Sequence, residues 1–425
     1  MKKLLSLFLV LMLLLSALPA LGEGVTTVKF WTHINEAWNA SYEGLIAEFE
    51  AANPDIKIDY QRFPYDEFEA KIQTSLMAGS AAADVYEVWG GWMLDFASQG
   101  VLSETPAQFA ADLENDAYPP VLGALKHDGK YYGAPVEFNI EHGAMIMNKK
   151  LWEQSGMPYP TTWNELIEDA KKVAVQDGEA MTMRGFGYAN GDTLIANFLA
   201  LILQQGGQYL KEDGSVDFNT PEALKAMSML VGYTADDHIN NFDAITNGDV
   251  QGDHIMVALD ESYGCIRGPW VISDLEQTYG LVMGVDFDYI GQPPFFEGVE
   301  QKFAAETGWS LCVAKNSTVQ DAAWRFVEFL NQPDVLVRHN IACAQVPPRK
   351  SVAADPAYLA GAPYMAPLLD KLQYSEFIGP FNTDIIKSYM NQTFMALCSG
   401  DHSEEAVKAA LAKMTEDLAQ NMKIY

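Results

Sequence analysis

Two tryptophans separated by two glycines form the most distinctive candidate binding feature of the chain. Trp89-Gly90-Gly91-Trp92 begins at the last residue of the segment Asp84 to Trp89, which predicts a buried strand. Open α/β sheets bind ligands outside the carboxyl ends of their strands, and glycines let the backbone approach a ligand closely. Flat rings suit the weakly apolar C–H faces of sugars, and aromatic contacts contribute roughly 0.5–1.5 kcal/mol beyond area burial. The competing interpretation is that one ring, above all Trp92, packs beneath the loop as core.

Polar residues that could hold hydroxyl groups occur in two further loops. Trp31 ends the first predicted strand, and Asn35 and Glu36 follow it. Asn190 and Asp192 lie in a glycine-flanked loop before an apolar helix. Carboxylates and amides bind hydroxyl groups, the carboxylates through strong charge-assisted hydrogen bonds. The same residue types also cap helix N-termini, so both roles stay open for these positions.

Motifs for common catalytic and metal chemistry are missing from the sequence. The seven histidines are scattered and none forms HExxH, which argues against a zinc site. None of the four cysteines forms a CxxC pair. Neither GxSxG, GxxxxGKS/T nor GxGxxG occurs. We therefore expect no metal, no cofactor and no catalytic residue, and we expect that the protein is not an enzyme.

The N-terminus predicts export. Lys2 and Lys3 precede an apolar run from Leu4 to Leu15, and Ala20 and Gly22 supply small residues before a cleavage point. This layout is typical of a secretory signal peptide covering residues 1–22, and the apolar run is shorter than the roughly 20 residues that span a bilayer. No cysteine lies near the cleavage point, so we expect a soluble periplasmic or extracellular protein, or one held at the cell surface by a partner.

The net charge of −30 excludes two classes of partner. A surface this acidic repels nucleic acid and anionic lipid. It does not choose a small ligand. The remaining chain of just over 400 residues predicts two domains or more.

Strands and helices alternate along the chain, as in an α/β fold with a largely parallel sheet. Val25 to Trp31 predicts the first strand, and Thr162 with Glu165 forms a capping box that begins a later helix. Thr220-Pro221 begins another helix, with proline at its first position. Further predicted elements are a helix through Trp38, Tyr42, Leu45 and Phe49, a strand at Ile56–Tyr60, a helix through Phe68, Ile72 and Leu76, and a C-terminal helix at Ser403–Met422.

An ordered series of segments resembles the family 1 extracellular solute-binding proteins, which are sugar-binding subunits of ABC importers and include maltose-binding proteins. The most specific stretch is GKYYGAPVEFNIEHGAMIMNKKLWEQSGMPYPTTWNELIEDAKKV, and others are VKFWTHINEAWNASYEGLIAEFEAANPDIKIDY, AAADVYEVWGGWMLDFASQGVL, DGSVDFNTPEAL, GWSLCVAKNSTVQDAAWRFVEFLNQPD and VPPRKSV. The resemblance implies the α/β two-lobe periplasmic-binding-protein fold with a ligand cleft between the lobes. It implies a first lobe of residues 23–137 plus 288–331 and a second lobe of 138–287 plus 332–425.

The resemblance also implies a function and partners. We expect a monomer that captures a carbohydrate, an oligosaccharide, and delivers it to the permease subunits of an ABC importer. Two alternatives stay open, an exported glycoside hydrolase that works through two carboxylates and a binding protein for a non-sugar solute.

Further site residues follow from the same resemblance. Glu137 and Asn139 lie where the chain crosses between lobes, where a side chain can contact ligand or stabilise the hinge. Trp309 in ETGWS matches a family motif, as does Arg349 in VPPRKS, which could equally form a surface ion pair. The family places a Gly-x-Trp in the second lobe, and Gly268-Pro269-Trp270 matches it, but the preceding HIMVALDESYGCIR fits the spacing poorly. The second-lobe ring is therefore expected to be Trp270 or Tyr263.

Overall fold

The first sheet forms from strands that are rich in β-branched and aromatic residues. A computed structural model describes residues 24–79, 82–177, 180–189, 191–240 and 252–425. β1 (Thr26–His33) pairs in parallel with β2 (Ile56–Phe63) and β3 (Val85–Trp89). β13 (Trp309–Val313) pairs antiparallel with β3 and with β6 (Ala134–Pro135), giving the order β2-β1-β3-β13-β6. Every residue of β3 and β13 is buried, as expected at the centre of a sheet.

Helices of the first lobe bury one apolar face against this sheet. α2 (Glu36–Ala52) begins where the Asn35 side chain accepts a hydrogen bond from the Trp38 amide. The Tyr42 ring of α2 meets Phe30 of β1 edge-on, with centroids 5.2 Å apart. Burying a large apolar side chain contributes roughly 1.5–3 kcal/mol, so this face holds α2 in place. The other helices that cover the lobe are α3 (Tyr65–Met77), α4 (Gly90–Ser98), α5 (Ala107–Asp116), α6 (Pro119–Leu125) and α14 (Gln320–Leu330).

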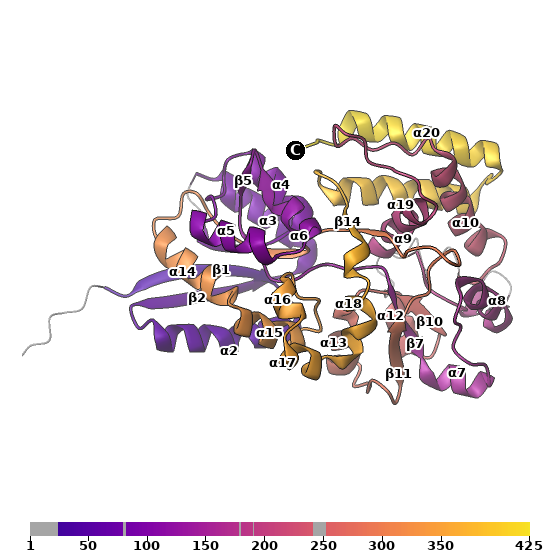
Figure 1. Cartoon of the computed structure of the whole chain (residues 1–425), viewed down its shortest axis with the longest axis horizontal. Coiled ribbons are helices and arrows are strands. Elements are labelled where there is room, and N and C mark those ends of the chain that lie inside the picture. The colour runs from indigo at the N-terminus through magenta and orange to yellow at the C-terminus, as the bar shows by residue number, and fades with distance from the viewer. Residues whose placement is uncertain (1–23, 80–81, 178–179, 190, 241–251) are drawn as a thin grey trace, which may run out of the picture.

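The second lobe combines a small antiparallel sheet with a helical layer (Figure 1). β7 (Ala144–Asn148) lies between β10 (Gly264–Ile266) and β11 (Phe287–Gly291). α9 (Asp192–Gln204) is buried around its whole circumference, which explains its continuous apolar sequence. It packs against α10 (Pro221–Ala235), α19 (Thr383–Ser399) and β12 (Phe303–Ala305), and α20 (Glu404–Asn421) covers α19 from outside.

Shorter elements complete the described chain. They are β4 (Lys126–His127), β5 (Lys130–Tyr131), α7 (Lys149–Ser155), α8 (Trp163–Val173), β8 (Val175–Asp177), β9 (Ala180–Met183), α12 (Asp253–Ala258), α13 (Trp270–Gln277), α15 (Pro333–Ala342), α16 (Lys350–Ala353), α17 (Pro356–Gly361), η1 (Pro363–Met365), α18 (Ala366–Leu369), η2 (Leu372–Tyr374) and β14 (Ser375–Phe377).

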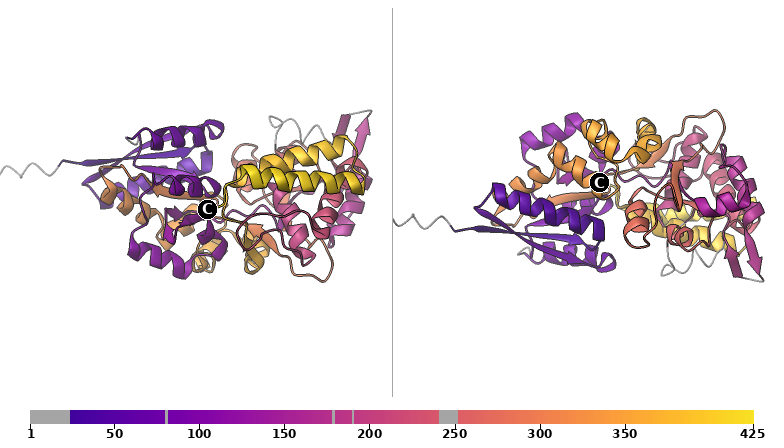
Figure 2. Two further views of the ribbon diagram at one scale, coloured as in Figure 1. Left: turned by 90° about the horizontal axis from the view of Figure 1, so that it is seen from above. Right: turned by 90° about the horizontal axis from the view of Figure 1, so that it is seen from below.

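Ordered segments, not a flexible linker, connect the lobes. The chain passes between them after β6, before β13 and before α19. The passing segments bond to one another, because β12 pairs with β14 and the Asn139 amide donates to the Thr307 carbonyl oxygen at 3.3 Å. Both views in Figure 2 show the lobes side by side, with the C-terminus between them. There Lys423 Nζ donates to Ser98 Oγ of the first lobe at 2.8 Å.

The two-lobe α/β fold is confirmed, and two lobe boundaries differ from the expected ones. Residues 288–331 were expected in the first lobe, but β11 pairs along its whole length with β7 in the second sheet. Residues 332–425 were expected in the second lobe, but α15 packs on α2 of the first. His339 of α15 lies edge-on to Trp38, with centroids 4.9 Å apart, and Arg338 pairs with Glu48 at 2.6 Å. The expected signal peptide, residues 1–22, lies outside the described residues.

Candidate functional site

A cavity of about 310 Å³ lies where the lobes meet. It lies at the carboxyl ends of the parallel strands: His33 ends β1, Tyr65 follows β2, and Trp89 ends β3. The cavity therefore lies at the edge of the first-lobe sheet where α/β proteins commonly bind ligands. The second lobe contributes Asp192 and Trp270, so the cavity has walls from both lobes. Its lining residues are His33, Asn35, Trp38, Tyr65, Trp89, Glu137, Asn139, Glu141, Asp192, Trp270, Trp309 and Gln345.

Trp309 is the centre of the aromatic wall. The His33 ring stacks on its indole, with centroids 4.3 Å apart and planes 7° apart. Trp89 and Trp92 meet the same indole edge-on at 5.4 Å and 5.7 Å. Tyr65 completes the group at 6.0 Å. Rings held on several sides lose little further freedom when a ligand packs on them, so this wall is preorganised for binding.

The opposite wall carries Trp270, which two neighbours hold in place. Its indole Nε1 donates to Glu141 Oε1 at 2.8 Å. The His254 ring lies edge-on to it, with centroids 5.2 Å apart. Trp270 is half-buried and lines the cavity, so its ring is available to a ligand from the second lobe.

Three polar side chains on the first crossing line the cavity at every second position. Glu137, Asn139 and Glu141 share one side because side chains alternate along an extended chain. Glu137 Oε1 accepts a hydrogen bond from the Trp309 amide at 3.0 Å. A Cβ atom at Gly308 would lie 2.4 Å from that oxygen, and Gly308 has φ +74°, so glycine is required there. Burial raises the pKa of Glu137 to about 8, helped by the charges of Glu87 and Glu141.

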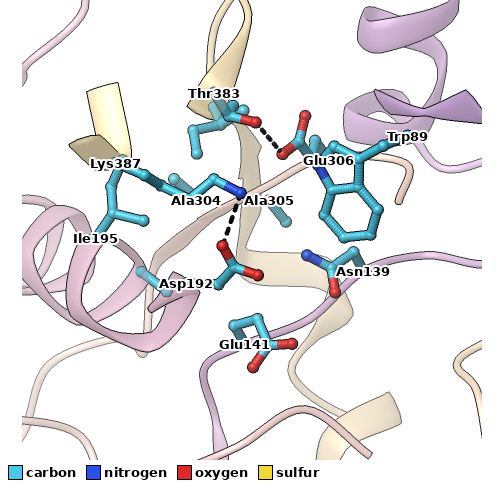
Figure 3. Close-up of a pocket in the computed structure, with 12 residues that line it drawn as sticks. Trp89, Asn139, Glu141, Asp192, Ile195, Ala304, Ala305, Glu306, Thr383 and Lys387 are labelled. Carbon is cyan, nitrogen blue, oxygen red and sulfur yellow. Dashed lines mark hydrogen bonds and ion pairs between the residues drawn. The ribbon is translucent and has the colours of Figure 1, made fainter. Parts of the chain in front are cut away.

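A polar recess of about 30 Å³ adjoins the cavity and shares four lining residues with it: Trp89, Asn139, Glu141 and Asp192. Its volume is about that of one water. Lys387 of α19 enters the recess and lies 2.7 Å from Asp192 Oδ1 and 2.6 Å from Asp384 Oδ1. On its other side Thr383 Oγ1 donates to Glu306 Oε1 at 2.8 Å (Figure 3).

The carboxyl groups of the recess titrate differently because their neighbours differ. Burial raises the pKa of Glu306 to about 7, against the opposing charge of Lys387. Burial also acts on Asp192, but the charges of Lys387 and Arg267 and the hydrogen bond from Lys387 outweigh it and lower the pKa. Asp192 is therefore ionised at neutral pH.

Most of the predicted site residues line the cavity, and of the two candidate second-lobe rings Trp270 lines it and Tyr263 does not. The residues that do so are Asn35, Trp89, Glu137, Asn139, Asp192, Trp270 and Trp309. Asn35 is also the N-cap of α2, so the capping role expected as an alternative is present. Asn190 lies outside the described residues.

Five predicted residues do not reach the cavity, and local packing explains each. Trp31 packs against Phe63 and Tyr86, and the Trp92 indole Nε1 donates to Asp384 Oδ2 at 2.6 Å. Tyr263 packs edge-on against Trp152. Arg349 forms ion pairs with Asp112 and Asp116 of α5 at 2.6 Å and 2.8 Å. Glu36 is in the first turn of α2 and lines a separate groove opposite Asp274.

The cavity and recess also contain residues that the sequence analysis missed. Glu141 could have been found, because it continues the alternation of Glu137 and Asn139. Tyr65 could have been found from its place after β2, by the rule that selected Trp89. Lys387 and Gln345 carry no local signal, since both come from segments far along the chain. The missed polar and aromatic residues are His33, Trp38, Tyr65, Glu141 and Gln345 in the cavity, and Glu306, Thr383 and Lys387 in the recess.

Comparisons with known proteins agree with this architecture. The sequence model of the family described as "Bacterial extracellular solute-binding protein" matches residues 35–336. A putative binding protein of Brucella abortus (strain 2308) is 30% identical over 191 residues, which are 44% of this chain and 45% of that protein. This chain thus spans less than half the length of that relative. The maltotriose-binding protein of Pyrococcus abyssi is 24% identical over 339 residues, covering 78% of this chain and 69% of that protein. The structure of maltose-bound MalE3 from T. maritima superposes with a TM-score of 0.74 at 22% identity, over 92% of this chain and 100% of that one.

Proposed function

The chain belongs to the bacterial extracellular solute-binding protein family, and from that premise we propose that it captures a carbohydrate outside the cytoplasm and delivers it to an ABC importer. One observation carries the proposal: a cavity between two lobes that is walled by indole rings and edged by carboxylates and amides. Sugars present both surfaces that such walls need, a C–H face and a rim of hydroxyl groups. The names of the Pyrococcus and T. maritima proteins, which refer to maltotriose and maltose, support the same ligand class.

In this proposal Trp309 and Trp270 face the sugar from the two lobes. Glu137 and Asn139 bind hydroxyl groups from the crossing, and Asp192 does so from the second lobe. A ligand that contacts both lobes favours the closed state through its higher affinity for it. The cavity of about 310 Å³ has room for about ten waters at roughly 30 Å³ each. We therefore propose a ligand of one or two sugar rings.

Delivery requires a membrane partner. No helix within the described residues is long and apolar enough to cross a bilayer. The sequence also lacks GxxxxGKS/T, the ATP-binding motif that an importer needs. We propose that a monomer binds a permease and that it does not chemically change its sugar. Purified protein that moved sugar into liposomes without a permease would contradict this role.

The experiment that tests the proposal is a ligand screen on protein that has been unfolded, freed of bound solute and refolded. Melting temperature is measured against a library of mono- and disaccharides, with polyols and peptides as comparison sets. Sugars that raise the melting temperature are then titrated by calorimetry, and the solution is analysed for cleavage products. Stabilisation by sugars, with the sugar recovered intact, is the expected result. Release of cleavage products would favour the glycoside hydrolase, and stabilisation only by peptides would overturn the carbohydrate ligand.

A further inference from the structure

The charges around the cavity and recess point to the kind of sugar that fits. Resting on the proposed carbohydrate function, we propose that the ligand is an amino sugar, with a protonated amine held by carboxylates where the cavity opens into the recess. The residues that carry the argument are Glu137, Glu141, Asp192 and Glu306, with the indole of Trp89.

Acidic side chains outnumber basic ones at this junction. Among the lining residues of the described chain, Lys387 is the one lysine or arginine, and two carboxylates, Asp192 and Asp384, already share it. Arg267 acts electrostatically on Glu141. None of the ion pairs formed by the described residues includes Glu137 or Glu306. The lining therefore holds two buried carboxyl groups that form no ion pair within the described residues, and a ligand cation would supply an ion-pair partner.

An unpaired donor at the same place indicates that the ligand also carries hydroxyl groups. Trp89 is 7% exposed, and its indole Nε1 is buried without a hydrogen-bond partner in the described structure. The indole stands beside Glu306 and above Asn139 at the edge of the recess (Figure 3). A buried N–H without an acceptor is unfavourable, so a ligand oxygen placed there would supply the missing hydrogen bond. A simple metal ion or alkylammonium ion has no such oxygen, whereas an amino sugar offers both groups.

The aromatic walls suit the same ligand. The faces of Trp rings attract cations as well as C–H groups, and Lys387 Nζ already lies 5.5 Å from the Trp89 ring centroid. The recess of about 30 Å³ has the size of one small polar group, such as an ammonium or a water. The larger cavity then holds the ring that carries the amine.

Proton exchange gives the proposal a second observable. Burial holds the pKa of Glu137 at about 8 and that of Glu306 at about 7, so both carry protons for part of the time at neutral pH. The groups acting on Glu137 are Glu87 and Glu141, and those acting on Glu306 are Lys387, Asp384 and Asp192. An ammonium bound beside these carboxyls favours their charged forms and lowers their pKa values. Binding of an amine should therefore release protons, and binding of a neutral sugar should not.

The test compares matched sugars on refolded, ligand-free protein at pH 7.5. The probes are the 2-amino, 3-amino and 6-amino deoxy forms of glucose, galactose and mannose, with each neutral parent sugar and each N-acetylated form. We expect at least one amine to bind about tenfold or more tightly than its own parent and its own N-acetyl form. Calorimetry in buffers of different ionisation enthalpy should show proton release for that amine only.

Variants separate charge from shape. Glu306→Gln and Glu137→Gln should each weaken binding of the amine several-fold more than they weaken binding of its neutral parent. Glu153→Gln removes an exposed carboxylate of α7 and should change neither value. If every neutral parent binds as tightly as its amines, the amino-sugar proposal is overturned and the carbohydrate function stands. If no sugar of either kind binds, the carbohydrate function falls as well, so the two failures are distinguishable.

Discussion

The indole of Trp270 donates a hydrogen bond to the carboxylate of Glu141 across 2.8 Å. The same carboxylate accepts the Gly268 amide at 2.9 Å. Glu141 thus ties the crossing segment to the start of α13 and fixes the ring that the second lobe presents to the cavity. Burial raises the pKa of Glu141, the Arg267 charge opposes that shift, and the two hydrogen bonds support the charged form.

Trp270 and Tyr263 should differ in what their removal costs. Trp270→Ala removes a half-buried cavity ring, so affinity for the best sugar of the screen should fall by roughly 1–3 kcal/mol, about 5–150-fold. The melting temperature should change little. Tyr263→Ala removes a ring packed on Trp152, so it should lower the melting temperature with affinity nearly unchanged. Calorimetric titration and thermal unfolding of both variants check this. The reverse pattern would make Tyr263 the second-lobe ring.

Local chemistry made much of the fold predictable. The expected capping box is present, since Thr162 and Glu165 bond reciprocally at the start of α8. Thr220 caps α10 with Pro221 in its first turn, also as expected. By contrast, the buried rings of β11, Phe287 and Tyr289, could have packed in either lobe, and only the pairing of β11 with β7 decides. The lobe boundaries were implied by the family resemblance, and neither that resemblance nor sequence periodicity specifies the long-range pairing of this strand.

The site was predictable to the extent that it follows strand ends. Trp89 was predicted as a site residue because it lies at the end of a strand, and it lines the cavity. Trp31 came from the same reasoning but packs on Phe63 and Tyr86, because the choice between the two faces of a strand depends on tertiary packing. Lys387 reaches the recess from α19, nearly two hundred residues after Asp192, and no local sequence pattern predicts their ion pair.

The buried carboxyl of Glu137 should make stability depend on pH. Its folded pKa of about 8 is raised above the usual value of 4.5. It therefore contributes stability fully below about pH 4.5, and that contribution is lost as the pH rises through 8. Glu137→Gln keeps an oxygen for the Trp309 amide and carries no charge. The free energy of unfolding of the Glu137→Gln variant, relative to wild type, should rise by about 4 kcal/mol between pH 5 and pH 9.

Denaturant unfolding at several pH values measures this difference. Comparing variant with wild type cancels the other buried groups, such as Lys371, whose pKa burial lowers to about 8. Glu153→Gln, on an exposed residue, is the matched control and should follow wild type at every pH. Parallel curves for Glu137→Gln and wild type would show that the Glu137 carboxyl does not titrate in this range.

Ligand should close the lobes. The cavity has walls from both lobes, and the crossing segments are ordered and bonded to one another. A sugar that contacts both walls stabilises the closed arrangement by its differential affinity. Small-angle scattering should show a smaller radius of gyration at saturating sugar than in refolded, ligand-free protein. An unchanged radius at saturation would mean that the lobes do not move on binding.

The last prediction separates the two tryptophans of the Trp89-Gly90-Gly91-Trp92 loop. Trp89 lines both the cavity and the recess, and its indole Nε1 has no hydrogen-bond partner among the described residues, so Trp89→Ala should remove a ligand contact. Its affinity should fall about 5–150-fold, or roughly 1–3 kcal/mol. Trp92 is 2% exposed, does not line the cavity, and donates to Asp384. Trp92→Ala leaves a void and an unpaired acceptor, which should cost roughly 3–5 kcal/mol of stability.

Trp89→Phe and Trp92→Phe refine the comparison, because each keeps a ring and loses only the indole N–H and part of the area. Trp89→Phe should recover part of the lost affinity, since a ring still covers the sugar. Trp92→Phe should recover most of the lost stability, since the void is smaller. Calorimetric titration and unfolding of the four variants measure both quantities. If Trp92→Ala keeps its melting temperature and loses affinity, Trp92 contacts the ligand and the assignment of the two rings is reversed.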